Sequence, residues 1–529
     1  MAGNRIVGNR LVEHRSADDR LAGHRSADHR SDRHRAAAAA LLFTLTLLAG
    51  GCTVMGPDYQ RPAVNLPADF GNGEAATAAA DTMIPADWWR RYGDAELDAL
   101  VDSVFASNTD LRLAAAQLEE AEAVLRETYA VLYPQLNLDA ASTRSRVTTR
   151  GAQPIPAGIP VVRWDQRAAF STSFELDFWG RLRRGAEAAQ AQLLATQYGK
   201  DVVQLGLAGT AVQAYFLLRS LDAQIAVTRD SLAAREESLA VARARARGGL
   251  ASELDVYQAE GLRADAAVQL NDLQRQRAAV ERQLGVLSGR LDLRVASGDL
   301  RALPVPPTPP VGLPSSLLDR RPDVRQAEAA LAAANARIGV AKAAMRPTIS
   351  LTGMLGGQSR DLSDLLSAGA RIWSLGVGLS LPIFDAGRLQ ARTDQAEARE
   401  RQALAAYQKS TETAFREVAD ALNNIERSAA AEQQLDVRLQ AARNTVRLAR
   451  LRYEAGYSAY LEVLDALRNQ NDAELAMVRN RQARLAYSVD LMKALGGGWT
   501  ASEPAPLPLT PVQAVGKVFG ASSEPLSAP

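Results

Sequence analysis

The chain has 529 residues and a formal net charge of +1, from 61 Lys+Arg against 60 Asp+Glu. This balance leaves no basic excess to follow a phosphate backbone, so we expect no nucleic-acid partner. All four histidines precede Cys52, the single cysteine. If residues 1–51 are a leader, the mature chain has no histidine, which excludes Ser-His-Asp catalysis, Cys-His catalysis and histidine metal sites. An enzyme that uses only carboxylates passes this test.

Residues 36–48 form a short apolar run that ends in Ala49-Gly50-Gly51-Cys52. The run has the length of a signal-peptide core and is too short to span a bilayer comfortably. Small residues followed by a cysteine are similar to a bacterial lipoprotein signal, in which the thiol carries a lipid. We therefore predict a lipid on Cys52 and no other cofactor. An ordinary signal peptide with an incidental cysteine is the alternative.

The rest of the chain repeats one unit. Gly180-Arg181-Leu182 recurs as Gly387-Arg388-Leu389, an offset of 207 residues. Internal repeats of this kind indicate a duplicated architecture. The predicted segments are a signal peptide (1–51), a lipid-anchored extended segment (52–93), a first repeat (94–300), a Pro-rich linker (301–316), a second repeat (317–497) and a Pro/Ser-rich tail (498–529).

Each repeat contains one very long stretch of helical pattern, at 181–247 and at 388–455. A helix of 67 residues spans ~100 Å, which is too long for a compact globule. Apolar residues recur at spacings of three, four and seven, as in a coiled coil. They are Leu207, Ala214, Leu217, Leu221, Ile225, Leu232 and Leu239. Shorter helices at 252–289 and 318–345, stacked end to end, match one long helix, so we expect a cylinder of helices.

Four segments alternate like strands. Residues 166–178 and 372–384 place apolar side chains opposite small or polar ones, and shorter partners begin at Gln135 and Thr348. A membrane barrel needs this alternation, with lipid on one side and water on the other, although an antiparallel sheet in a soluble domain alternates equally well. No apolar run of 18 residues follows residue 51, so we expect no further membrane helix.

Three tryptophans, Trp164, Trp179 and Trp373, lie in or beside these segments. Aromatic residues at such positions form the girdle of a membrane barrel. Four strands cannot close a barrel, because about eight is the practical minimum. An open edge in lipid leaves backbone groups without partners. Other copies of the chain must therefore complete the barrel, giving eight strands from two copies or twelve from three.

Several motifs occur in a fixed order between Cys52 and Trp499. They are Gly56-Pro57-Asp58-Tyr59-Gln60-Arg61-Pro62, Trp88-Trp89, Gly93-Asp94-Ala95-Glu96-Leu97, Leu176-Asp177-Phe178-Trp179-Gly180-Arg181, Asp319-Arg320-Arg321-Pro322-Asp323 and Leu495-Gly496-Gly497-Gly498-Trp499. Together they resemble the TolC-like outer-membrane efflux lipoproteins of the OprM and NodT type. Each motif is weak alone, and the ordered set is highly specific.

The resemblance implies a homotrimer in the outer membrane of a Gram-negative bacterium. Four strands per chain would build one twelve-stranded barrel in the outer-membrane lipids, with a long α-helical barrel below it as a periplasmic coiled-coil tunnel. The family's partners are a periplasmic adaptor and an inner-membrane pump of the RND type. The implied function is a passive conduit that expels drugs or other toxic small molecules.

Glycines break each long helical stretch, at Gly248-Gly249 and at Gly456, and turn the chain back at the tip of a hairpin. The resemblance places a pore gate just after the second tip, at Leu461, Glu462 and Asp465. We further expect adaptor docking at the tips. The docking residues are Arg247, Gly248, Gly249, Leu250, Tyr453, Gly456 and Tyr457. Ordinary explanations stay open: acids favour first helical turns, leucine is common in cores, and the glycines alone make the turns.

Three other functions remain as alternatives. The sequence has neither a Gly-x-x-x-x-Gly-Lys-Ser/Thr phosphate loop nor a Gly-x-Ser-x-Gly elbow, so we do not expect an enzyme. A lipid-anchored periplasmic coiled-coil protein without a pore would not need the alternating strands. A duct for type I protein secretion would share the same architecture.

Overall fold

The computed structural model describes residues 54–67, 69–70, 84–151, 155–156, 158–309 and 316–500. The predicted signal peptide, Cys52 and the tail beyond Thr500 lie outside these residues. The helices are α2 Ala95–Ser107, α3 Thr109–Ala130, α4 Arg181–Arg247, α5 Glu253–Leu287, α6 Leu317–Arg320, α7 Pro322–Ala343, α8 Arg388–Glu454 and α9 Tyr460–Ala494. The strands are β1 Gln135–Arg146, β2 Val162–Leu176, β3 Thr348–Ser359 and β4 Arg371–Ser380.

The same order of elements occurs twice. Helix α3, strands β1 and β2, and helices α4 and α5 are followed by α7, β3, β4, α8 and α9 in the same sequence. The matching helices have equal lengths: 22 residues in α3 and α7, 67 in α4 and α8, and 35 in α5 and α9. The repeat seen in the sequence is therefore a repeat of the fold.

The long helices follow the sequence prediction closely. Helix α4 covers the predicted 181–247, and α8 ends one residue before the predicted 455. The predicted helix 318–345 is divided, because Arg321 adopts an extended conformation ahead of Pro322, which begins α7. A residue before proline is driven out of the α region, which explains the break between α6 and α7.

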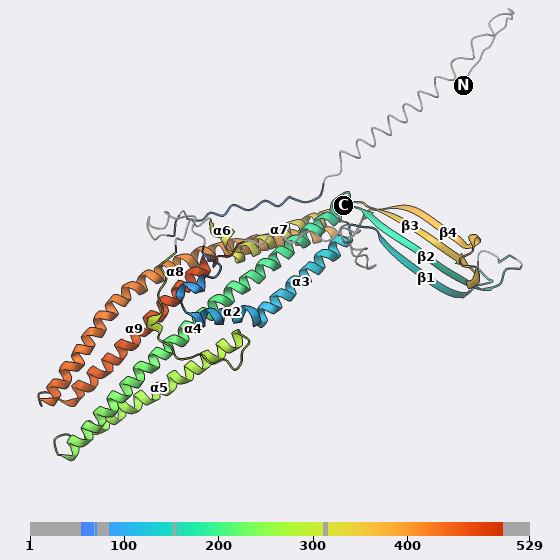
Figure 1. Cartoon of the computed structure of the whole chain (residues 1–529). Coiled ribbons are helices and arrows are strands. Elements are labelled where there is room, and N and C mark those ends of the chain that lie inside the picture. The colour runs from blue at the N-terminus through green and yellow to red at the C-terminus, as the bar shows by residue number, and fades with distance from the viewer. Residues whose placement is uncertain are drawn as a thin grey trace, which may run out of the picture. The chain divides into compact units, whose positions relative to one another are not determined.

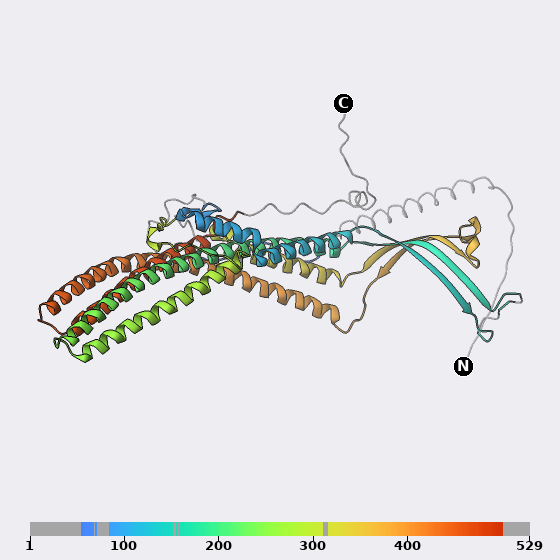
Figure 2. The ribbon, with the colours of Figure 1, turned by 60° about the horizontal axis from the view of Figure 1, so that its bottom comes forward.

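The helices pack lengthwise around α4. Helix α5 lies along the half of α4 that is remote from the sheet, whereas α3 and α7 lie along the half beside the sheet (Figure 1). Helix α8 packs in the same way against α9 and α7. The two hairpins α4–α5 and α8–α9 lie side by side (Figure 2). Shorter helices do stack end to end, but the predicted pairing of 252–289 with 318–345 was wrong. The end of α5 meets the start of α3, where the Asn108 side chain donates to the carbonyl of Leu287 at 2.9 Å. The end of α9 meets the start of α7, where Arg321 donates to the carbonyl of Ala494 at 3.0 Å.

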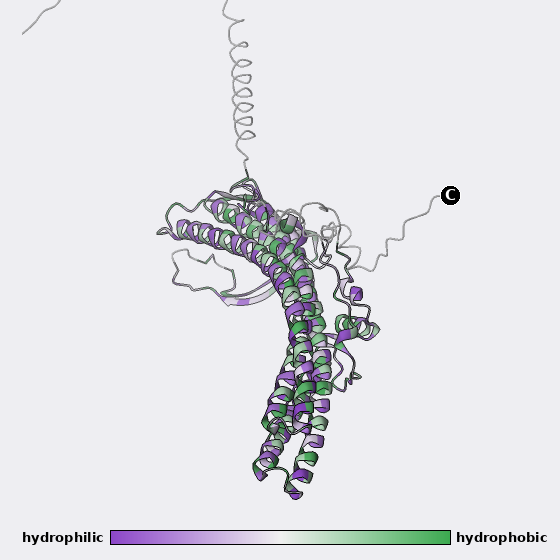
Figure 3. Cartoon of the chain, turned by 90° about the vertical axis from the view of Figure 1, so that its left-hand side faces the viewer, coloured by the Kyte–Doolittle hydropathy of each residue, from purple (hydrophilic) through white to green (hydrophobic). Residues whose placement is uncertain are grey.

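The predicted coiled-coil seam of α4 is mostly buried. Leu207, Leu221, Ile225 and Leu239 are all less than 9% exposed, but Leu217 is 38% exposed. The prediction was wrong for Leu217, because the helix drifts relative to an ideal heptad and this position turns outward. Hydrophobic and hydrophilic residues are mixed along the long helices (Figure 3), as expected when each helix has both a packed and a free face.

Helix α4 also contains an apolar window that the sequence analysis did not single out. This 18-residue window has a mean hydropathy of 1.3, and α4 is the one helix in the described part of the chain that is long and apolar enough to cross a membrane. Half of the window is buried inside the protein. A central helix of a packed bundle has the same composition, so the window is weak evidence for a membrane helix.

The four strands form one antiparallel sheet in the order β1-β2-β3-β4. Strands β1 and β4 are therefore its two edges. The strands begin at Gln135 and Thr348 as predicted, but β3 with 12 residues is longer than β4 with 10. The predicted strand 372–384 was too long at its end: β4 stops at Ser380, and Pro382 follows, which has no N–H for a ladder.

The core where the helices meet contains large aromatic residues and a buried cation. Tyr92, Tyr215 and Phe216 are fully buried. The guanidinium of Arg219 lies 4.7 Å from the Tyr215 ring centroid and 2.6 Å from a carboxylate oxygen of Glu96. This ion pair ties α4 to the short helix α2, which fixes the packing midway between the sheet and the tips.

Candidate functional site: an amphipathic sheet and two helical tips

One face of the sheet is a continuous apolar surface. Directly paired residues on neighbouring strands share a face, and the pairing joins Leu138 to Phe170, Phe170 to Leu355 and Leu355 to Trp373. The large side chains on this face are exposed in the single chain. They include Leu136, Leu138, Phe170, Leu351, Leu355, Trp373, Leu375, Val377 and Leu379. An apolar surface of this extent needs lipid or protein to cover it.

The opposite face is polar. Asp139 accepts a hydrogen bond from the hydroxyl of Ser171 on the neighbouring strand, at 2.5 Å. Asp165 accepts one from the side-chain amide of Gln358, at 2.8 Å. The sheet is thus amphipathic across its whole width, with the charged side chains of β2 turned away from the apolar face.

The three predicted girdle tryptophans lie at different levels. Trp164 and Trp373 are on the apolar face, in the half of the sheet remote from the helices. Trp179 follows β2, and its indole N–H donates to the carbonyl of Pro347 at 2.8 Å. Trp179 therefore lies at the junction of the sheet with α4, opposite the end where Trp164 lies.

The N-terminal segment runs from this junction along the helices. Met55 donates its backbone N–H to the carbonyl of Trp179 at 3.0 Å. Farther along, Arg184 of α4 binds Asp58, and Arg61 binds Asp319 at 3.0 Å. The motif in the sequence indicates this segment but not its path, because no local pattern specifies which helices an extended segment will lie along.

Each helical hairpin ends in the same tight turn. Gly249 has φ +71° and Gly456 has φ +78°, a conformation that side-chain-bearing residues rarely adopt. In both turns the next residue donates its N–H to a carbonyl five residues earlier, from Leu250 to Arg245 and from Tyr457 to Arg452. This is the Schellman pattern of helix ends. It leaves the Leu250 and Tyr457 side chains 75% and 80% exposed.

Close to the tips, side chains of the two hairpins contact one another. The guanidinium of Arg245 lies 4.5 Å from the ring centroid of Tyr453, and the Tyr453 ring lies 5.0 Å from that of Tyr460. Burial is the main cause that raises the pKa of the Tyr460 hydroxyl. Of the predicted docking residues, Arg247, Gly248, Gly249, Leu250, Gly456 and Tyr457 are exposed. Tyr453 is half-buried between the hairpins instead.

The predicted gate residues do not all face the same way. Leu461 is 57% exposed, and Asp465, one turn along α9, is also exposed. Asp465 forms an ion pair with Arg468 at 3.3 Å. Glu462 instead pairs with Arg452 of α8 at 3.3 Å and closes the hairpin. Arg468 was not among the predicted gate residues, although its spacing of three from Asp465 indicates such an ion pair.

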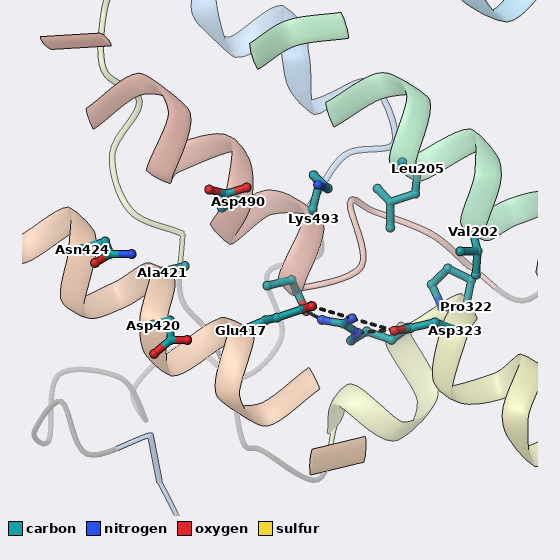
Figure 4. A pocket seen from close by; sticks show the side chains of 13 residues that line it. Val202, Leu205, Pro322, Asp323, Glu417, Asp420, Ala421, Asn424, Asp490 and Lys493 are labelled. Carbon is teal, nitrogen blue, oxygen red and sulfur yellow. Dashed lines mark hydrogen bonds and ion pairs between the residues drawn. The ribbon is translucent and has the colours of Figure 1, made fainter. Parts of the chain in front are cut away.

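The Arg-Arg-Pro-Asp motif borders a cavity of about 370 Å³ between α4, α7, α8 and α9 (Figure 4). The buried Arg321 guanidinium lies 2.6 Å from Asp323 and 2.8 Å from Glu417, and it donates to the carbonyl of Ala494. Burial lowers the pKa of Arg321, but the two carboxylates outweigh this effect and raise it. Arg321 thus joins the start of α7 to α8 and to the end of α9.

Within the described part of the chain, no group of three or more His, Cys, Asp and Glu side chains could hold a metal ion.

Comparison with known proteins identifies the family. The family of outer membrane efflux proteins matches residues 100–290 and 313–497. The solvent efflux pump outer membrane protein SrpC of Pseudomonas putida is 35% identical over 477 residues, covering 87% of this chain and 98% of its own. The outer membrane protein OprJ of Pseudomonas aeruginosa is 38% identical over 471 residues, covering 87% of this chain and 95% of its own.

A third relative is similar in both sequence and structure. The cation efflux system protein CusC of Escherichia coli is 34% identical over 474 residues, covering 87% of this chain and 98% of its own. A crystal structure of CusC superimposes with a TM-score of 0.75 at 31% identity, covering 84% of this chain and all of the CusC chain.

Proposed function

The chain belongs to the outer membrane efflux protein family and resides in the outer membrane, and we propose that it forms the trimeric exit channel of a tripartite efflux system. A periplasmic adaptor and an inner-membrane pump of the RND type are the partners in this proposal. The observation that carries it is the amphipathic sheet with two open edges.

The open edges favour a shared barrel. Strands β1 and β4 each have one edge whose backbone N–H and C=O groups have no neighbouring strand in the described part of the chain. The apolar face suits a lipid environment, in which unpaired backbone groups cost several kcal/mol each. Pairing β4 of one copy with β1 of the next satisfies both edges. Three copies then give twelve strands, with the polar face lining the pore.

The apolar face ends at different heights on the two edge strands, and this offset supports the same arrangement. Arg144 of β1 pairs directly with Trp164 of β2. Arg371 of β4 pairs with Gly357 of β3, and Gly357 in turn pairs with Ala168 of β2. The two arginines, at which the apolar face ends, are thus offset by four residues, ~14 Å, across three strand spacings, also ~14 Å. If they lie at equal depth, the strands tilt by about 45°, close to the tilt of membrane barrels.

The helices offer matching surfaces for neighbouring copies. Helix α5 exposes Leu254, Tyr257 and Val268, and α8 exposes Val437 and Leu451. In a trimer these apolar side chains would lie between copies, and the three sets of hairpins would enclose a tunnel. Leu461 and Asp465 would then form rings of three at its narrow end, and the tips at Leu250 and Tyr457 would meet the adaptor.

We propose toxic organic small molecules as the transported substances. The name of SrpC gives solvents as its substrates, whereas that of CusC gives cations. Growth of a deletion strain with solvents, antibiotics or metal salts, with and without the gene restored, separates the two classes.

The test of the channel itself uses two positions on one strand. Val377→Arg puts a cation on the apolar face of β4, and Ser374→Arg puts the same cation on the polar face of β4. A lipid-facing arginine costs about 2–4 kcal/mol near the bilayer midplane. We expect Val377→Arg to reduce insertion and Ser374→Arg to retain trimers that conduct in planar bilayers. Equal behaviour of the two variants, or conduction by a stable monomer, would contradict the barrel.

A further inference from the structure

At the end of the sheet that is remote from the helices, the apolar face ends in arginines. Arg144 and Arg146 on β1 pair with Trp164 and Val162, and Arg371 on β4 lies two residues before Trp373. Residues two apart on a strand, and directly paired residues, share a face. All three arginines therefore lie on the apolar face.

These three cations have no partner of opposite charge. Each is exposed, and no carboxylate within the described residues lies at ion-pair distance from any of them. The apolar face of the four strands contains no Asp or Glu at all, whereas the polar face contains Asp139, Asp165 and Glu175. The positive charge on the apolar face is therefore uncompensated.

In the proposed barrel, the arginines would lie at the depth of lipid headgroups. The guanidinium of Arg144 is 5.4 Å from the ring centroid of Trp164. Tryptophans at the end of an apolar band mark the membrane–water interface. The cation–π contact holds Arg144 at this level, and a strand tilt of about 45° in the proposed barrel would place Arg371 at the same depth.

We propose that Arg144, Arg146 and Arg371, here called the arginine rim, bind the phosphate groups of anionic lipid in the outer leaflet. This inference rests on the proposed trimer. Arginine matches phosphate oxygens with two parallel hydrogen bonds. Strands β1 and β4 are the edges, so Arg371 of one copy would lie beside Arg144 and Arg146 of the next. Each junction between copies would then present three guanidinium groups to one phosphorylated headgroup.

The test compares two sets of substitutions at the same end of the sheet. One variant carries Arg144→Gln, Arg146→Gln and Arg371→Gln on the apolar face. The control carries Arg163→Gln and Arg167→Gln, which lie on the polar face of β2. Purified trimers are titrated with lipid A, with lipid A freed of its phosphates, and with inorganic phosphate, and bound lipid is counted by native mass spectrometry.

We expect wild type and control to bind lipid A alike, and the rim variant to bind it far more weakly. Each arginine near an anionic lipid surface contributes about 5-fold in affinity, so the loss is on the order of 100-fold. Equal weakening of both variants, or equal binding of lipid A without phosphates, would overturn the proposal. Competition by inorganic phosphate at the same concentration as lipid A would also overturn it.

Conductance of the same preparations keeps this inference separate from the proposed function. If trimers of the rim variant conduct like wild type and also bind lipid A like wild type, then the proposed lipid binding by the three arginines is wrong and the proposed channel stands. Absence of trimers and conductance in the wild type would refute the channel.

Discussion

The backbone N–H of Met55 donates to the carbonyl of Trp179 at 3.0 Å and fixes the N-terminal segment at the junction of sheet and helices. Gly56 packs against Gly339 of α7 so closely that a Cβ on Gly56 would lie 2.4 Å from the Gly339 Cα. Cys52 itself lies outside the described residues.

The first prediction is lipidation of Cys52. Mass spectrometry of protein taken from membranes should find an acylated Cys52 at the mature N-terminus. Cys52→Ser should weaken membrane anchoring but leave trimers intact, because Met55 and the Asp58–Arg184 ion pair still hold the segment. An unmodified Cys52 in membrane-derived protein would contradict the prediction.

The second prediction concerns the gate. Leu461→Ala should raise the resting conductance in planar bilayers, because the proposed ring of three leucines would resist wetting of a narrow pore. Asp465→Ala should reduce cation preference, and Arg468→Ala should increase it, because the two side chains form an ion pair. The opposite directions for Asp465 and Arg468 distinguish a charge effect from a change of pore size.

Asp436→Ala is the control for the gate, since Asp436 is an exposed acid on α8 away from the tip. It should leave conductance and selectivity unchanged. If the three gate variants also match wild type, then these residues are only helix surface and the constriction lies elsewhere.

The third prediction concerns docking at the tips. Leu250→Asp and Tyr457→Asp should lower efflux with trimers intact, because both side chains are exposed and support no core. Gly249→Leu and Gly456→Leu should also lower efflux. Nothing lies within 4 Å of a Cβ added at either glycine, so these changes cost only the left-handed conformation, about 1 kcal/mol.

Leu291→Asp is the matched control, because Leu291 is 80% exposed but lies after α5, far along the chain from either tip. Drug susceptibility at equal expression is the measurement. If the tip variants confer the same resistance as wild type, the adaptor does not dock there.

The fourth prediction concerns pH and Glu281. Burial raises the pKa of the Glu281 carboxyl, but the N–H of Val295 and the guanidinium of Arg277 outweigh this and lower it overall. A carboxyl with a lowered folded pKa stabilises the protein fully above its unfolded value, ~4.3, and loses that stabilisation as the pH falls through the folded pKa.

Glu281→Gln should therefore reduce stability at pH 7 by about 1–3 kcal/mol, and the difference from wild type should shrink below about pH 4. Thermal unfolding of the detergent-solubilised protein across pH measures it. Asp436→Asn, at an exposed position, is the surface control and should leave the unfolding temperature close to that of wild type. A constant difference between Glu281→Gln and wild type at all pH values would show that ionisation of Glu281 contributes nothing.

The sequence alone determined the helices and strands of this protein. Helix periodicity and glycine breaks defined α4 and α8 almost to the residue, and alternation defined the strands, because both patterns depend on near neighbours. Local patterns also had limits. The end of β4 was misjudged where Pro382 stops the ladder, and the outward turn of Leu217 depended on the path of its helix.

Only the tertiary structure decided which residues meet. It placed Trp179 at the junction rather than level with Trp164, put Tyr453 between the hairpins, and turned Glu462 toward Arg452 of α8. It also put Arg144 and Arg371 on the same face of the sheet. These relationships join residues far apart in the chain, and they follow from strand register and helix packing, which no local pattern of residues specifies.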